Sequence, residues 1–241
     1  MRPLADSLGL GIYTPSEAAF YARVSPKVMH RWVFGDKDGQ PVIKRQYCSP
    51  ADDVVTFLDF IQTLAVREVR NRHGLSLQKI RKGIDAARER YGIEYPLAKR
   101  HTIYLFSDQH GGGHGEMVIK LPDDKDPIKN DYVQLTGKDE KNYLMVRVVE
   151  MFLDDLEFDP GTGLASLYEP ITHKGAKIVL DPRRLFGEPV VEPGGYTART
   201  LWNATNTEGG IEEAAEAYGV GREEVEVANI FYDNLMRRRI A

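Results

Sequence analysis

The chain has 241 residues and a formal net charge of -4, with 42% hydrophobic and 28% charged residues, which is an ordinary globular composition. It contains no apolar run of about 18 residues and no apolar segment near its start, so the sequence predicts neither a membrane span nor a secretory signal, and we expect a cytoplasmic protein. Its single cysteine, Cys48, excludes an internal disulfide and the usual structural zinc sets, and we expect no cofactor.

The charges are unevenly distributed along the chain. Residues 1–101 contain 17 Lys and Arg against 11 Asp and Glu, a net charge of +6, whereas the rest contains 15 against 25, a net charge of -10. A basic first part followed by an acidic second part predicts a nucleic-acid-binding module joined to a module that binds a different kind of partner.

Two short helices are predicted near the start. Thr14 followed by Pro15 and Glu17 has the residue types of a capping box, and Ser25 with Pro26 begins a second helix that ends at Gly35. Two short helices separated by a tight turn are typical of a helix-turn-helix motif. The turn residues 36–41 and the run 42–47 then predict a β-hairpin wing.

Two longer helices should complete a first domain that covers residues 1–95. Ser49 and Pro50 are expected to begin one helix, whose apolar residues recur at helical spacing between Val54 and Val69, and Ser76 begins another over residues 77–91. The stretch from Gly92 to Lys99 predicts the domain boundary.

Residues 96–175 are expected to form an α+β middle region with a β-hairpin. Strands are predicted at 101–106 and 116–121 around a glycine-rich turn, and a third at 132–135. A helix at 142–153 should end in the acidic run 154–157.

Residues 176–241 are expected to form a domain of three helices, near 197–206, 211–218 and 222–235, after a strand at 177–182. One spacing occurs twice, a Glu-Ala-Ala triplet followed by Val five positions after the second Ala, at Glu17-Ala18-Ala19…Val24 and Glu213-Ala214-Ala215…Val220. This echo predicts a second helix-turn-helix-like unit.

The first unit carries the candidate DNA-binding residues. Polar side chains on its second helix could contact base edges, and cations of the wing suit phosphates. Short capped helices also occur in many folds that never bind DNA. The candidate residues are Ser16, Ser25, Lys27, His30, Arg31, Lys37, Lys44 and Arg45.

Three other patterns do not predict a catalytic or metal site. His110 and His114 flank three glycines, which a hairpin turn explains better than a metal site does. The run 155–161 resembles a calcium loop, but Ser166 stands where a bidentate Glu is needed, so a helix end followed by a turn is the better interpretation. There is no nucleophile elbow, P-loop or zincin helix, and we expect no enzyme.

The second unit has the opposite charge. Arg222 stands alone among six glutamates, which would repel phosphates, so this unit is expected to contact protein rather than DNA. The glutamates are Glu212, Glu213, Glu216, Glu223, Glu224 and Glu226.

Two segments resemble known domains. The first helix pair, the wing and the segment 74–81 resemble the MerR-like winged helix. The segment 178–197, with its motif Asp181-Pro182 followed by Gly187, Pro189 and Val190, is similar to a small tri-helical domain common in prokaryotic antitoxins. A chain with these two domains in this order resembles one branch of the VapB-type antitoxins. The chain departs from that pattern at 192–197, where a glycine-threonine-arginine-like turn is usual.

The resemblance implies a type II antitoxin that neutralises a PIN-like ribonuclease toxin and represses its own operon by binding operator DNA. A homodimer is expected because helix-turn-helix proteins usually bind two half-sites about one helical turn apart. The tail residues Arg237, Arg238 and Arg239 would then bind the carboxylate cluster of the toxin, although cations at a helix C-terminus also simply complement its dipole. The alternative is a ligand-sensing MerR-like regulator without a toxin partner.

Overall fold

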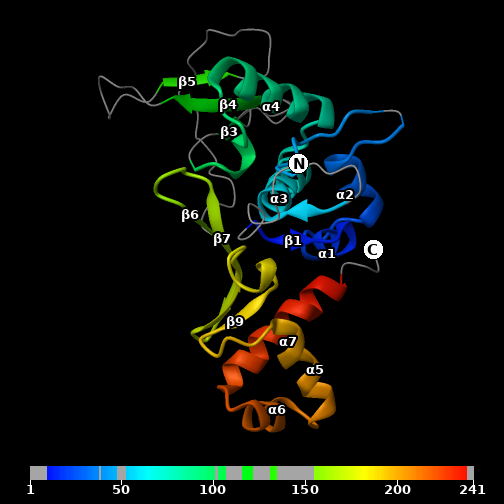
Figure 1. Ribbon diagram of the computed structural model, residues 1–241, viewed down its shortest axis with the longest axis vertical. Helices are drawn as coiled ribbons and strands as arrows, with labels where there is room; N and C mark the ends of the chain where they lie inside the picture. The colour runs from blue at the N-terminus through cyan, green and yellow to red at the C-terminus, as the bar shows by residue number, and fades with distance from the viewer. Residues whose placement is uncertain are drawn as a thin grey trace.

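The computed structural model describes residues 10–37, 39–47, 53–100, 103–106, 116–121, 131–134 and 155–237 (Figure 1). Helices are combined with three small antiparallel sheets, of two, three and four strands, in this part of the chain. This agrees with the expected α+β class.

The N-terminal region combines two short helices with two longer ones. Its elements are β1 (Ile12–Tyr13), α1 (Pro15–Tyr21), α2 (Pro26–Val33), β2 (Val55–Thr56), α3 (Phe57–His73) and α4 (Leu77–Tyr91). The predicted caps of α1, α2 and α4 at Thr14, Ser25 and Ser76 are confirmed, since each side chain accepts a hydrogen bond from a backbone N–H of its helix. Phe57, Phe60 and other apolar side chains of α3 are buried at the centre of the region.

The start of α3 differs from the prediction. The helix begins at Phe57, and the cap is Thr56, whose hydroxyl accepts from the N–H of Asp59. Val54 precedes the helix, because the neighbouring residues of β2 pair with β1. The predicted helical stretch beginning near Val54 is therefore wrong in its first turn, and the predicted cap at Ser49 and Pro50 lies outside the described residues.

The predicted strand of the wing is also wrong. Residues 42–47 form no strand, and the N–H groups of Val42 and Ile43 both donate to the carbonyl of Trp32, at 2.8 and 3.3 Å. A bridge between Asp36 and Gly39 makes a tight turn before them. Both apolar side chains are buried against the end of α2, so burial, rather than pairing with a second strand, determines the path of this segment.

The three predicted strands of the middle region are confirmed. β3 (Ile103–Phe106), β4 (Glu116–Leu121) and β5 (Asp131–Gln134) form an antiparallel sheet with β4 in the middle. The helix predicted at 142–153 lies outside the described residues. Ahead of this sheet, η2 (Pro96–Ala98) is buried against α3.

The C-terminal region is a four-stranded antiparallel sheet followed by three helices. The strands are β6 (Leu156–Phe158), β7 (Ala165–His173), β8 (Ala176–Leu180) and β9 (Val190–Glu192), in that order, with η4 (Leu185–Gly187) before β9. The helices are α5 (Ala198–Thr207), α6 (Ile211–Tyr218) and α7 (Arg222–Met236), where the sequence predicts them.

Two features of this sheet were not predicted. The acidic run that was interpreted as a helix end contains β6, and the turn after it is closed by Asp159, whose carboxylate accepts from the N–H groups of Gly161 and Thr162. β7, the longest strand of this sheet, contains Pro170, and the pairing register shifts between Tyr168 and Ile171. A proline cannot donate to a ladder and is tolerated in a strand interior at such an irregularity.

The N-terminal and C-terminal regions are joined by aromatic side chains. The rings of Tyr21 on α1 and Phe231 on α7 stack at 6.3 Å, and Phe60 on α3 meets Tyr168 on β7 at 6.0 Å. Figure 1 shows the C-terminal end of α7 beside α1. One buried cluster includes residues from both regions, and the division into domains at 95 and 175 stays a prediction.

Candidate nucleic-acid interface

The turn between α1 and α2 is short and tightly bonded. Arg23 has a left-handed backbone with φ 52°, and the N–H of Val24 returns to the carbonyl of Ala19 at 3.0 Å. Ala18 and Ala19 are buried, and their small side chains let the two helices approach closely. The Glu-Ala-Ala…Val spacing therefore produces a compact helix pair.

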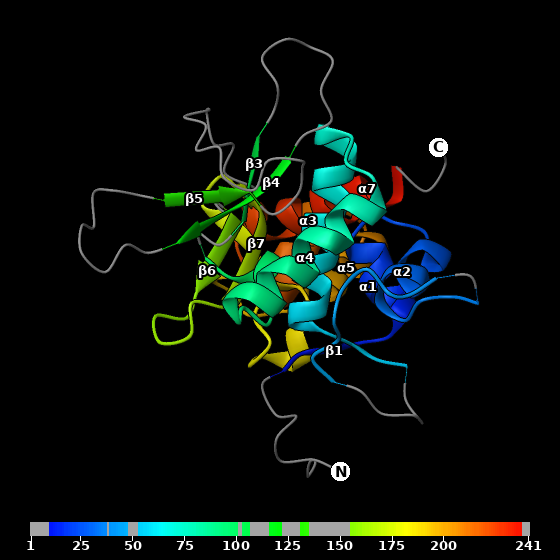
Figure 2. The same cartoon turned by 90° about the horizontal axis from the view of Figure 1, so that it is seen from above.

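α2 has one buried and one exposed face. Met29, Trp32 and Val33 are buried against the rest of the region, whereas Lys27 and Arg31 are exposed one helical turn apart. Figure 2 shows α1 and α2 together at one edge of the molecule, away from the sheet of β3, β4 and β5. Both cations of α2 therefore lie on an exposed face of the described part of the chain.

Three of the candidate cations are available for a ligand. Lys27, Arg31 and Lys37 are exposed and form no ion pair with the described residues. Ser16 is exposed on the first turn of α1, whereas the hydroxyl of Ser25 already accepts from the N–H of Val28 at 3.2 Å. The candidate surface therefore centres on the two cations of α2 and on Lys37 in the following turn.

The other three candidates make contacts within the protein. The imidazole of His30 lies 3.9 Å from the carboxylate of Asp53 and next to the ring of Phe34. Lys44 pairs with Glu94 at 3.1 Å, and Arg45 lies over the ring of Phe34 at 4.7 Å. Contacts within the protein thus partly fix these three side chains. That they also contact DNA remains a prediction.

Buried polar residues of α3 hold the segment that carries Lys44 and Arg45, and the sequence interpretation did not identify them. The carboxylate of Asp59 accepts from the N–H of Gln46 at 2.9 Å and from the N–H of Thr56 at 3.2 Å. Burial raises the pKa of Asp59 to about 6, although these hydrogen bonds and the charge of Arg45 favour the ionised form. The Thr56-x-x-Asp59 spacing, a capping-box pattern, was the available signal.

The preceding turn is held by α4. The guanidinium of Arg81 donates to the carbonyl of Pro41 at 3.0 Å and to that of Gln40 at 2.6 Å. Gly35 has φ 83°, and a Cβ there would lie 2.8 Å from the carbonyl oxygen of Gly39, so the turn that positions Lys37 needs a glycine. Hydrogen bonds therefore hold the backbone of the surface next to α2 in one conformation.

The second helix pair repeats the first with the opposite charge. The N–H of Val220 returns to the carbonyl of Ala215 at 3.0 Å, and Ala214 and Ala215 are buried between α6 and α7. Arg222 pairs with Glu212 and Glu226. The expected likeness in backbone geometry is present, and acidic side chains dominate the exposed surface of α6, at Glu212, Glu213 and Glu216.

The remaining candidates fall at the margins of the described chain. Arg237 is exposed at the C-terminal cap of α7, and Arg238 and Arg239 lie outside the described residues, as do His110 and His114. Among the described residues, no group of three or more His, Cys, Asp or Glu side chains could hold a metal ion.

A cavity lies between the two regions. It encloses about 160 Å³ and is lined by residues of α1, α3, the C-terminal sheet and α7, including Tyr21, Arg67 and Tyr168. Pockets for organic ligands usually enclose about 300–1,000 Å³, so this cavity is too small to favour the ligand-sensing alternative.

Comparisons with known proteins cover most of the chain. No family model matches it. It is 24% identical over 226 residues to a protein of Mycobacterium tuberculosis provisionally named antitoxin VapB45, over 87% of this chain and 88% of that protein. The crystal structure of Rv2018 from Mycobacterium tuberculosis matches with a TM-score of 0.58 and 21% identity, over 90% of this chain and 96% of that one. Within the described residues, no helix is long and apolar enough to cross a membrane. The chain thus shares its fold with a solved protein and is similar along most of its length to a protein named as an antitoxin.

Proposed function

We propose that this chain is the antitoxin of a type II toxin-antitoxin system, which neutralises a PIN-like ribonuclease toxin and represses its own operon. The observation that carries the proposal is the similarity to the VapB45-named protein, which extends over 87% of this chain rather than over one module. The basic first part and the acidic second part support a protein with two kinds of partner.

The DNA-binding part of the proposal places α2 in the major groove of the operator. Lys27 and Arg31 lie on the exposed face of α2, and a guanidinium there can donate to two acceptors of a guanine. Lys37 in the next turn is then placed to contact a phosphate. Proteins with such helix pairs commonly bind two half-sites about one helical turn apart, so the functional unit on DNA is a homodimer.

The toxin-binding part of the proposal belongs to the C-terminal region. Its exposed glutamates on α6 would repel phosphates and suit a basic surface on a protein partner. Arg237, Arg238 and Arg239 follow α7, and guanidinium groups form strong paired hydrogen bonds with carboxylates. The tail would then block the carboxylate cluster of the nuclease.

The first test is neutralisation. The gene next to this one is expressed alone and together with this chain, and growth and ribonuclease activity of its purified product are measured. We expect the product to be toxic alone and inactive in a stable complex with this chain. A chain truncated after Met236 should inhibit less; equal inhibition leaves the tail only its dipole role, and no inhibition by the full chain contradicts the proposal.

The second test is DNA binding to the region upstream of its own gene. The double variant Lys27→Ala, Arg31→Ala should lose about 10- to 100-fold in affinity in a gel-shift assay, because each base contact contributes about 1–3 kcal/mol. The matched control, Lys174→Ala, Arg222→Ala, removes the same charge from the C-terminal region, where both cations pair with Glu226. Equal affinities of the two double variants would place DNA binding elsewhere.

A further inference from the structure

Four consecutive exposed residues, Arg183, Arg184, Leu185 and Phe186, form what we call the η4 tip. Leu185 and Phe186 are 53% and 66% exposed, the two highest values among the large apolar residues that the structure describes. Ile12, 40% exposed, lies on β1, which packs against η4. Exposed apolar residues gathered at one place mark interaction sites more often than scattered ones do.

The backbone of the tip has an unusual conformation. Leu185 and Phe186 have φ values of 46° and 56°, in the left-handed region that side chains with a Cβ rarely adopt, and Gly187 follows with φ 87°. The residues that the structure describes bury neither apolar side chain. Strain of this kind, kept without an internal gain, is typical of functional positions.

The surrounding residues hold the tip in this shape. The carboxylate of Asp181 accepts from the backbone N–H of Arg183 at 2.9 Å, and the N–H of Arg184 donates to the carbonyl of Asp181. The hydroxyl of Tyr13 on β1 donates to the carbonyl of Gly187 at 2.8 Å, and a Cβ at Gly187 would collide with that hydroxyl. The tip is therefore pre-organised, which lowers the entropic cost of binding.

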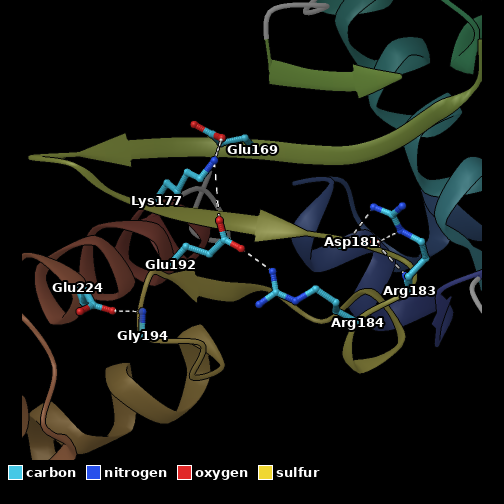
Figure 3. Close-up of polar contacts among 8 residues, drawn as sticks. All are labelled: Glu169, Lys177, Asp181, Arg183, Arg184, Glu192, Gly194 and Glu224. Carbon is cyan, nitrogen blue, oxygen red and sulfur yellow. Dashed lines mark hydrogen bonds and ion pairs between the residues drawn. The ribbon is translucent and has the colours of Figure 1, made fainter. Parts of the chain in front are cut away.

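The charges beside the apolar pair are arranged with the cations outermost. Figure 3 shows Arg183 directed to Asp181 and Arg184 directed to Glu192. The side chains of the two arginines are 67% and 43% exposed, whereas those of their acidic partners are 9% and 29% exposed. The solvent side of the tip is consequently cationic around an apolar centre, although the ion pairs are neutral overall.

We propose that the η4 tip docks into an apolar socket with an acidic rim on a protein partner, and that in the toxin-antitoxin role proposed above this partner is the toxin. The inference rests on that proposed function for the identity of the partner. Protein interfaces are enriched in aromatic residues and arginine, and the tip presents Phe186 beside two arginines. Nucleic acid is disfavoured, because the centre of the tip is apolar and each of its two arginines is already paired with a carboxylate.

The test uses the full chain and the purified product of the neighbouring gene. Leu185→Gly, Phe186→Gly removes both apolar side chains and also relieves the left-handed strain, so the variant should unfold at the same or a higher temperature than wild type. Its affinity for the partner, measured by calorimetry, should fall about 30- to 100-fold. The matched control is Tyr196→Gly, which removes another exposed aromatic residue, 38% exposed, in the turn between β9 and α5, and should keep wild-type affinity.

The outcomes separate this inference from the function on which it rests. A wild-type chain that does not bind the neighbouring product overturns both. Wild-type binding with an unchanged affinity of the double glycine variant overturns only the role of the tip. A variant that keeps its partner but loses operator DNA, or changes from dimer to monomer in light scattering, also overturns it and assigns the tip to DNA or to a second copy of the chain.

Discussion

The helix pairs α1–α2 and α6–α7 use the same backbone device with opposite surfaces. In each pair the N–H of a valine returns to the carbonyl of the second alanine of a Glu-Ala-Ala triplet, at 3.0 Å in both cases. The first pair exposes Lys27 and Arg31, and the second exposes Glu212 and Glu216. Residue spacing determines the shape of such a pair, whereas the exposed charges determine the class of partner that it can meet.

The two pairs also begin their second helices differently. α2 is capped by the hydroxyl of Ser25, whereas Gly221, before α7, has no side chain to offer. There the buried carboxylate of Glu224 accepts from the N–H of Gly221 at 2.9 Å and from the N–H of Gly194 at 2.6 Å. The C-terminal pair is thus tied to the loop before α5 by the group that closes its own helix start.

We expect the largest effect from a substitution that removes the contact between the N-terminal and C-terminal regions. Phe231 is 4% exposed and its ring stacks on that of Tyr21. Phe231→Ala removes this ring and leaves a cavity, so we expect a loss of about 3–5 kcal/mol in the free energy of unfolding. Urea unfolding followed by both fluorescence and circular dichroism should show one shared transition at a lower midpoint. Two separated transitions would mean that the regions fold independently.

Buried carboxylates give the two regions opposite responses to pH. Burial raises the pKa of Asp59 to about 6, from 3.8, so the stability that this group contributes is fully present below 3.8 and is lost as the pH rises through 6. For Asp181 burial also raises the pKa, but the hydrogen bonds from Arg183 outweigh it and the pKa is lowered. Stability from Asp181 is therefore lost as the pH falls.

The difference between Asp59→Asn and wild type isolates the first of these effects. Between pH 3.5 and pH 7, wild type should lose the stability that comes from the raised pKa of Asp59, whereas the variant has no such group to titrate. The free energy of unfolding of the variant minus that of wild type should therefore rise by about 3 kcal/mol, which corresponds to a shift of about two pKa units. Urea titrations at the two pH values measure it, with Asp181→Asn as the control that should change in the opposite direction. A pH-independent difference would contradict the raised pKa.

Removal of the N-terminal cap of α2 should have the next smaller effect on stability. Ser25→Ala leaves the N–H of Val28 without its acceptor, and we expect a loss of about 1 kcal/mol. Ser25→Gly should lose only a few tenths of a kcal/mol, since glycine is accepted at this position of a helix. Thermal unfolding of both variants distinguishes a cap from a residue with no structural role, for which neither change would matter.

The smallest effect is expected from adding a serine cap to α7, in the pair α6–α7. Gly221 has φ -67° and ψ 147°, the ordinary backbone of an N-cap, so Gly221→Ser should gain a few tenths of a kcal/mol. Its Cβ would meet only the flexible end of Glu223. A loss in a careful thermal comparison would show that the Glu224 arrangement excludes a side chain at this position.

Local signals predicted the parts of the fold that depend on local physics. Helix starts at Thr14, Ser25 and Ser76 were predictable because a cap is satisfied within four residues, whatever surrounds it. The start of α3 was placed too early, because Val54 fits the helical spacing and only pairing of β2 with the distant β1 excludes it from the helix. β7 was missed since Pro170 argues against a strand until the irregular register is known.

The candidate site was predictable to a similar extent. Exposure of Lys27 and Arg31 follows from their position opposite Met29 and Trp32 on a short helix. The engagement of Lys44 with Glu94, 50 positions away, and the hydrogen bonds of Asp59 to the segment before α3 depend on long-range packing. The left-handed pair at Leu185 and Phe186 had no signal at all, since neither residue type favours that conformation.

The stacking of Tyr21 on Phe231 has a consequence for synthesis of the chain. The two residues are 210 positions apart, so at a translation rate of about 5–20 residues per second the surface of α1 waits roughly 10 to 40 seconds for its partner helix. During that time the apolar side of α1, with Phe20 and Tyr21, lacks the cover that α7 gives it in the finished fold. Contacts this distant in sequence also slow the closing step of folding. The order of the elements therefore leaves this side of α1 without α7 until the end of synthesis.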